Sequence, residues 1–286
     1  MANGPLHPTA PGGGASAGDI RLQHAMSALD GQRPIEAEQI AGEVLKTDPR
    51  NARALYIVGS ALVMQGRAHD AIMPLETAAR GRHDPQIDTM LGIALRQAGR
   101  SEDALSRLKR ATKRQPPYAA AFLELGRLLV AMQRCDEAIE ALRGGVAVAP
   151  MMPQLSIQLG YALLNSRDCA EAKVAFARAL SVAPGSHDAL FGMAKAHQEV
   201  GENAAAVDYF RRALRVNPDD QAAWLSLGHC LLELGESDAG FECFRAAARG
   251  DPRHYGSALT SLAAAARGRF WLRPSAAARF FGKTKA

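Results

Sequence analysis

Histidine and cysteine are the residues of this 286-residue chain best suited to metal binding or acid–base chemistry. The four cysteines are Cys135, Cys169, Cys230 and Cys243. They form no C-x-x-C pair, and no histidine stands near them at the spacing of zinc ligands. The histidines are scattered, and none forms an H-x-x-x-H pair that would share one face of a helix. The sequence therefore predicts no metal, no cofactor and no catalytic residue, and we interpret the cysteines as buried apolar residues in a reducing compartment.

Charge is concentrated near the C-terminal end. Residues 267–286 contribute +6 to a formal net charge of +5, so residues 1–266 sum to −1. Because that longer part is nearly neutral, a nucleic-acid-binding face along the whole chain is not expected. The basic residues alternate with aromatic ones: Arg269, Phe270, Trp271, Arg273, Arg279, Phe280 and Phe281. Such a tail suits an anionic membrane surface or a polyanion. The open alternative is that its aromatic residues cover the last helices as a lid.

Small residues and prolines recur every 33 or 34 residues. One series is Gly59, Gly92, Gly126, Gly160, Ala194 and Gly228, a second is Ala71, Ala104, Ala138, Ala172, Ala206 and Gly240, and a third is Pro116, Pro150, Pro184, Pro218 and Pro252. A fixed period of this length indicates an array of repeats. Within each period, apolar residues follow helical spacing in two runs, which predicts two antiparallel helices and no sheet. The small residue of the first series should let the two helices approach closely.

The period divides the chain into three parts. Residues 1–17 are rich in glycine and proline and are expected to be a disordered leader. Residues 18–254 form the predicted array, with repeats near 18–51, 52–84, 85–118, 119–152, 153–186, 187–220 and 221–254, the register of the first being open by a residue or two. Residues 255–286 are expected to form a capping helix and the basic aromatic tail. No signal peptide and no apolar run long enough for a membrane span is present, so a cytoplasmic location is expected.

The last repeat carries a recognisable pattern. It reads Trp224-x-x-Leu227-Gly228-x-x-Leu231, then Gly240-x-x-x-Phe244, then Ala247 and Pro252. This resembles the tetratricopeptide repeat, whose signature is W-x2-L-G-x2-Y, A-x3-F and P on a 34-residue period. The resemblance implies an all-α, right-handed superhelical solenoid of about seven helix-turn-helix repeats with a C-terminal capping helix. It also implies a non-enzymatic scaffold or adaptor that binds a peptide or helix of a partner protein in its concave groove.

The resemblance further implies which residues line that groove, namely the second, fifth, ninth and twelfth of each repeat. They include Arg53, Tyr56, Ser60, Thr89, Ile93, Arg96, Leu123, Arg127, Ile157, Tyr161, Phe191, Lys195, Leu225 and His229. An apolar floor with mostly basic charges suits an extended peptide or an amphipathic helix that carries acidic residues. The open alternative is that some of these side chains pack between neighbouring first helices.

Two further functions remain open from the sequence. The basic aromatic tail predicts a peripheral contact with a membrane surface or a polyanion. The tail also resembles, loosely, the junction in bacterial chains where such an array precedes a sulfotransferase or glycosyltransferase domain. That likeness suggests an accessory subunit, or a relic, of such an enzyme.

Overall fold

The structure of the protein is a computed structural model that describes residues 17–81 and 83–248. Most of the predicted leader, Pro252, the predicted capping helix and the basic aromatic tail lie outside the described residues. The second, fifth, ninth and twelfth positions of the predicted repeats all lie within them, so the predicted groove residues can be placed.

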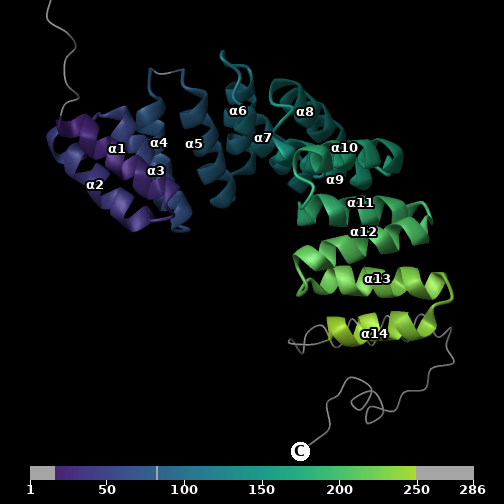
Figure 1. Cartoon of the computed structure of the whole chain (residues 1–286). Helices are drawn as coiled ribbons and strands as arrows, with labels where there is room; N and C mark the ends of the chain where they lie inside the picture. Colours follow the sequence, from purple (N-terminus) through teal and green to yellow (C-terminus); the bar gives the residue numbers. More distant parts are fainter. Residues whose placement is uncertain (1–16, 82, 249–286) are drawn as a thin grey trace, which may run out of the picture. The chain divides into compact units, whose positions relative to one another are not determined.

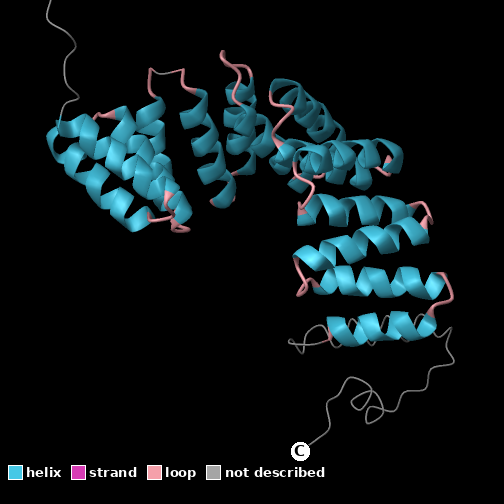
Figure 2. Cartoon of the chain, viewed as in Figure 1, coloured by secondary structure: helices cyan, strands magenta, loops and turns pink. Residues whose placement is uncertain are grey.

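All regular elements of the described residues are α-helices, and none is a strand (Figures 1 and 2). In chain order they are α1 (Ala17–Asp30), α2 (Pro34–Thr47), α3 (Ala52–Met64), α4 (Ala68–Ala79), α5 (Pro85–Gln97), α6 (Ser101–Thr112), α7 (Ala119–Ala131), α8 (Cys135–Val148), α9 (Pro153–Asn165), α10 (Cys169–Val182), α11 (His187–Glu199), α12 (Asn203–Val216), α13 (Gln221–Glu233) and α14 (Ser237–Ala247). The all-α prediction is confirmed for this part of the chain. Helix α1 begins at Ala17, one residue inside the predicted leader.

The chain divides into two compact units inside α7, Met1–Glu124 and Leu125–Ala286. In the first unit, each helix from α1 to α6 packs against the next, and α1 and α5 both also contact α3. In the second unit, α8 to α14 pack in succession, and α9 also contacts α11. The odd-numbered helices are the first helices of their pairs. Because they contact one another from pair to pair, they form one side of each unit, which we call the first-helix face.

Each first helix ends in the same backbone conformation. The second residue after it has a positive φ, and it recurs at the period of the sequence: Gln32 (58°), Gly66 (75°), Gly99 (79°), Gln133 (61°), Arg167 (62°), Gly201 (76°) and Gly235 (84°). Glycine adopts this left-handed conformation without steric cost, whereas glutamine and arginine adopt it at some cost. The turn reverses the chain so that the second helix packs back against the first.

The first and second helices of a pair approach most closely at the predicted small residue. A Cβ atom added at Gly92 would lie 2.6 Å from Cγ of Leu108, and one added at Gly126 would lie 2.5 Å from Cγ of Leu142. In the second unit, a Cβ atom added at Gly160 would lie 2.6 Å from Cζ of Phe176. Real Cβ atoms do not come this close to their neighbours, so a larger residue at these positions would force the facing side chain to shift. The predicted close approach is confirmed at these pairs.

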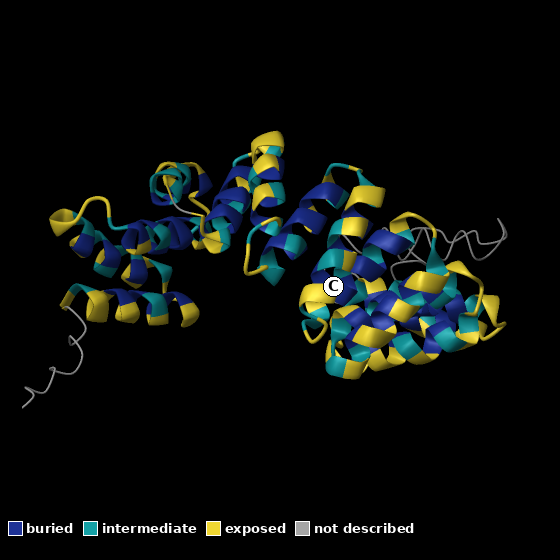
Figure 3. Ribbon diagram, turned by 90° about the horizontal axis from the view of Figure 1, so that it is seen from above, coloured by how far each residue is buried: buried dark blue, intermediate teal, exposed yellow. Residues whose placement is uncertain are grey.

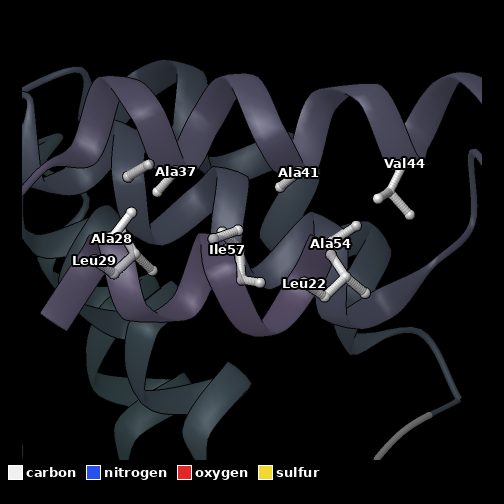
Figure 4. Packing of buried hydrophobic residues seen from close by; sticks show 10 residues of the cluster. Leu22, Ala28, Leu29, Ala37, Ala41, Val44, Ala54 and Ile57 are labelled. Carbon is white, nitrogen blue, oxygen red and sulfur yellow. The ribbon is translucent and has the colours of Figure 1, made fainter. Parts of the chain in front are cut away.

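The interior is built mainly from alanine and leucine. Between α1, α2 and α3, the fully buried Ala28, Ala37, Ala41 and Ala54 surround Ile57 (Figure 4). Figure 3 shows buried residues where helices face one another and exposed residues on the outer sides of the helices. Such small side chains permit close helix packing, which explains how a chain with only 6% aromatic residues still buries a core.

Candidate functional site

A cavity of about 730 Å³ opens on the first-helix face of the second unit. We call it the α9–α11 pocket. It is lined by Tyr161, Leu164, Asn165, Arg167, Asp168, Cys169, Ala170, Phe191, Lys195, Glu199 and Val200. Four of the predicted groove positions therefore line one cavity, namely Tyr161, Leu164, Phe191 and Lys195. The contact between α9 and α11 brings them together although they span 34 residues of sequence.

The Tyr161 side chain forms one wall and is held from two sides. Its ring meets Phe176 edge to face, with 5.2 Å between ring centroids, and its hydroxyl donates a hydrogen bond to the Asp188 carbonyl oxygen at 2.9 Å. Burial raises the pKa of the Tyr161 phenol, and the carboxylates of Asp188 and Asp220 add to the rise. Tyr161 therefore stays neutral over the physiological pH range and contributes apolar surface to the pocket.

The Phe191 ring forms another part of the wall and is similarly fixed. It meets Phe210 edge to face with 5.6 Å between centroids, and it stacks on His187 with 6.2 Å between centroids. Side chains that are already ordered lose little entropy when a ligand binds. The two aromatic walls are thus preorganised for an apolar group.

Charges of both signs surround these walls. Lys195 is half-buried, and its Nζ atom donates to Oε1 of Gln198 at 2.9 Å. Asp168 caps α10 by accepting from the Glu171 backbone N–H at 3.0 Å, so its carboxylate is engaged within the fold. Arg167 and Glu199 are exposed at the rim. The arrangement suits an apolar group with a carboxylate placed near Lys195.

Three other predicted groove positions, Tyr56, Ser60 and Val63, line a second cavity, in the first unit. This cavity of about 740 Å³ is lined by Met26, Leu29, Asp30, Gln32, Tyr56, Ser60, Val63, Met64, Met90 and Gln97. We call it the methionine pocket. Its three methionines are not among the groove residues predicted from the sequence. Met26 lies in the repeat whose register was open, and Met64 and Met90 stand outside the four groove positions.

Four predicted groove residues are buried: Ser60, Thr89, Leu123 and Ile157 are 4%, 3%, 6% and 7% exposed. The Thr89 hydroxyl donates to the Pro85 carbonyl oxygen of its own helix at 2.6 Å. Thr89, Leu123 and Ile157 line neither cavity, as the alternative of packing between helices predicts, whereas Ser60 is a buried residue in the wall of the methionine pocket. Of the others in these repeats, Arg53 and Arg127 are exposed and Ile93 is half-buried. Arg96 approaches Glu124, with Nη2 and Oε2 3.4 Å apart.

The last two predicted residues lie against α14. Leu225 packs on the cluster of Phe244 and Ala248, and His229 meets the Phe244 ring edge to face with 5.2 Å between centroids. Burial lowers the pKa of His229, and the nearby Lys195 ammonium adds to the decrease. His229 is therefore mainly neutral at pH 7.

The cysteines divide into two kinds. Cys230 and Cys243 are buried, and burial raises the pKa of each thiol to about 11. Cys135 and Cys169 are partly exposed, so the interpretation of all four as buried residues was wrong for these two. Within residues 17–81 and 83–248, no group of three or more His, Cys, Asp or Glu side chains is arranged to hold a metal ion. In the same part of the chain, no helix is long and apolar enough to cross a membrane.

A succession of helix pairs on a 34-residue period, joined by left-handed turns, defines a helical repeat protein. The family model for the tetratricopeptide repeat matches residues 22–86, 89–156 and 191–254. The chain belongs to the tetratricopeptide repeat family. A search of the curated proteins finds no match.

Solved structures show the same fold at low sequence identity. PilF of Pseudomonas aeruginosa is 18% identical with a TM-score of 0.63, covering 74% of this chain and 96% of that one. The Cut9–Hcn1 hetero-tetramer of the APC/C is 15% identical with a TM-score of 0.67, covering 85% and 49%. YrrB, described as a TPR protein with an unusual peptide-binding site, is 17% identical with a TM-score of 0.52, covering 64% and 95%.

Proposed function

We propose that this protein is a non-enzymatic scaffold that binds a segment of a partner protein on its first-helix face, with the α9–α11 pocket as the main contact. Membership of the tetratricopeptide repeat family and the similarity to YrrB, a protein described as having a peptide-binding site, support a role in protein binding. The observation that carries the proposal is the meeting of Tyr161, Phe191 and Lys195 in one cavity. Fixed aromatic walls beside a cation are typical of sites that hold a peptide side chain.

The chemistry of the pocket defines the segment that fits. An apolar side chain would lie between the rings of Tyr161 and Phe191, against Leu164. A carboxylate nearby in the segment would accept a hydrogen bond from Lys195, which is half-buried and already faces the cavity. We therefore expect a peptide or amphipathic helix in which an apolar residue stands close to an acidic one.

The alternatives of membrane or polyanion binding rest on residues 267–286, which lie outside the described residues. The accessory-subunit alternative rests on the same tail. Membership of the tetratricopeptide repeat family and the residues that meet in the α9–α11 pocket both support protein binding, and for that reason we favour the protein-binding function.

Site-specific photo-cross-linking in the native cell tests the location of the contact. A photoreactive phenylalanine at Leu164 in the pocket is expected to cross-link to one segment of a partner protein, identified by mass spectrometry. The same residue at Val174 is the matched control, because Val174 is 68% exposed on α10 and does not line the pocket. The proposal fails if position 164 gives no cross-link, or if position 174 captures the same segment with equal yield.

A further inference from the structure

A cavity of about 580 Å³ opens between the second helices α12 and α14, with α13 as its floor. We call it the α12–α14 cleft. Its surface is mostly apolar, and α13 contributes Trp224, Leu227 and Leu231. Trp224 is fixed in place, because its Nε1–H donates to the Pro218 carbonyl oxygen at 2.8 Å. The cleft is a preformed apolar cavity that shares no lining residue with the α9–α11 pocket.

One repeat earlier, the chain places an aromatic ring of its own at the equivalent position. Tyr209 stands 34 residues before Cys243, and its ring stacks on His197 of α11 with 5.4 Å between ring centroids. Leu231, 34 residues after His197, lines the α12–α14 cleft together with Cys243. Cys243 brings no ring, so the cavity lies where the preceding repeat has an aromatic side chain. A planar aromatic group therefore fits this place.

Two repeats earlier, an ion pair joins the equivalent second helices. Arg143 of α8 donates to the carboxylate of Glu171 on α10. Arg211 of α12 stands 68 residues after Arg143, but Ala239 of α14 stands 68 residues after Glu171. The α12–α14 cleft therefore keeps the arginine of this pair and has an alanine at the position of the carboxylate.

The charge that the cleft offers to a ligand is positive. Arg211 and Arg215 of α12 are exposed lining residues. Glu242 is the acidic lining residue, and it pairs with Arg245 of its own helix. A carboxylate on the ligand would complement the two arginines, because guanidinium groups bind carboxylates through strong charged hydrogen bonds.

We propose that the α12–α14 cleft binds a segment of a partner protein in which an aromatic residue stands close to an acidic one. The aromatic ring would lie against Leu231, as Tyr209 lies against His197 one repeat earlier, and the carboxylate would bind Arg211. The partner would supply the two groups that the chain itself supplies in the preceding repeats. This inference concerns the second helices and does not depend on the α9–α11 pocket being a partner site.

Cys243→Tyr places in the cleft the ring that the preceding repeat has, and so should close it. Random peptides displayed on phage are selected on the full-length protein with the Cys243→Tyr variant in excess as competitor, which removes peptides bound elsewhere, including the α9–α11 pocket. The retained peptides are expected to share an aromatic residue within one helical turn of an acidic one. Ala175→Tyr, the same change two repeats earlier, is the matched control and should leave their binding unchanged.

Isothermal titration of a retained peptide tests the charged contact. Arg211→Glu is expected to weaken binding by about tenfold or more, because it sets like charges against each other. Arg212→Glu changes the net charge equally at an exposed position that does not line the cleft, so it should leave the dissociation constant unchanged. Circular dichroism establishes that each variant keeps its helices. Ala239→Glu, which supplies the carboxylate in place of the ring, serves as competitor if Cys243→Tyr does not fold.

The proposal is overturned if no peptide is retained against the closed variant, as coverage of the cleft by another part of the chain would require. It is also overturned if the retained peptides lack the aromatic and acidic pair, or if Arg211→Glu binds them as tightly as the parent protein. Self-association of the full-length protein that Cys243→Tyr abolishes, measured by analytical ultracentrifugation, would assign the cleft to a second copy of the chain and would equally overturn the proposal.

Discussion

Replacing Phe176 by alanine is expected to lower the free energy of unfolding of the second unit by about 3 to 5 kcal/mol, the usual range for a buried aromatic residue. Phe176 on α10 is fully buried, and it lies between Gly160 of α9 and Gly192 of α11. Because glycine has no side chain, neither helix can fill the cavity that the variant leaves. Hydrogen exchange of the α9 to α11 amides measures the loss where it occurs.

The converse change adds volume at the same place. Gly160→Ala is expected to destabilise the protein by about 1 to 3 kcal/mol through overpacking against the Phe176 ring. Gly42→Ala is the matched control, because Gly42 lies in α2 with no atom within 4 Å of an added Cβ. There the better helix propensity of alanine should stabilise the protein by up to about 1 kcal/mol. Equal effects of the two alanines on thermal unfolding would show that Phe176 is not confined as we describe.

Asp88→Ala is expected to destabilise the first unit by about 3 kcal/mol, the lower end of the range for breaking a buried ion pair. Asp88 is 1% exposed, and its Oδ2 atom accepts from Nε of Arg110 at 3.0 Å, while Nε of Arg114 lies 3.7 Å away. The lower end applies because the Arg110 side chain is 42% exposed and can return to water. Urea unfolding of the full-length protein measures the change.

Asp103→Ala is the comparison for that experiment. Asp103 pairs with Arg100 on the surface, with both side chains about half exposed, and surface pairs contribute at most about 1 kcal/mol. If Asp88→Ala and Asp103→Ala lower the unfolding midpoint equally, Asp88 does not anchor α5 to α6. Asp88 stands where the last repeat has Trp224, so this ion pair replaces an apolar contact of the family pattern.

The helix pairs could be predicted from the sequence because small residues at the close helix contacts and glycines at the turns recur with the same period. Gly92 and Gly126 recur at the place where a leucine of the second helix passes close to the first, and a larger residue there would force that leucine to move. Gly66 and Gly99 recur where the chain turns back with a positive φ. The close contact and the turn both lie within one helix pair, so the sequence of a single repeat is enough to predict them.

The candidate site was harder to predict because side-chain size decides where a groove position points. At the fifth position, Thr89, Leu123 and Ile157 are buried, whereas the larger Tyr56 and Phe191 extend to a cavity. The spacing of the groove positions in the sequence does not show which of these side chains are buried and which line a cavity.

Turn and neighbouring residues were also missed. The α9–α11 pocket is also lined by Arg167 and Asp168 of the turn after α9 and by Cys169 at the start of α10, all outside the four groove positions. Which turn residues face the cavity depends on the contact between α9 and α11, which a single repeat does not contain.

The central claim is that the α9–α11 pocket holds an apolar and acidic segment of a partner. Isothermal titration of the segment cross-linked from position 164, against Lys195→Glu and Arg178→Glu, tests it most directly. Lys195 faces the cavity, whereas Arg178 is exposed on α10 and does not line it. We predict that Lys195→Glu weakens binding by about tenfold or more, equivalent to about 1.4 kcal/mol, and that Arg178→Glu leaves the dissociation constant unchanged. Unchanged binding by Lys195→Glu, or an equal loss in both variants, would contradict the account.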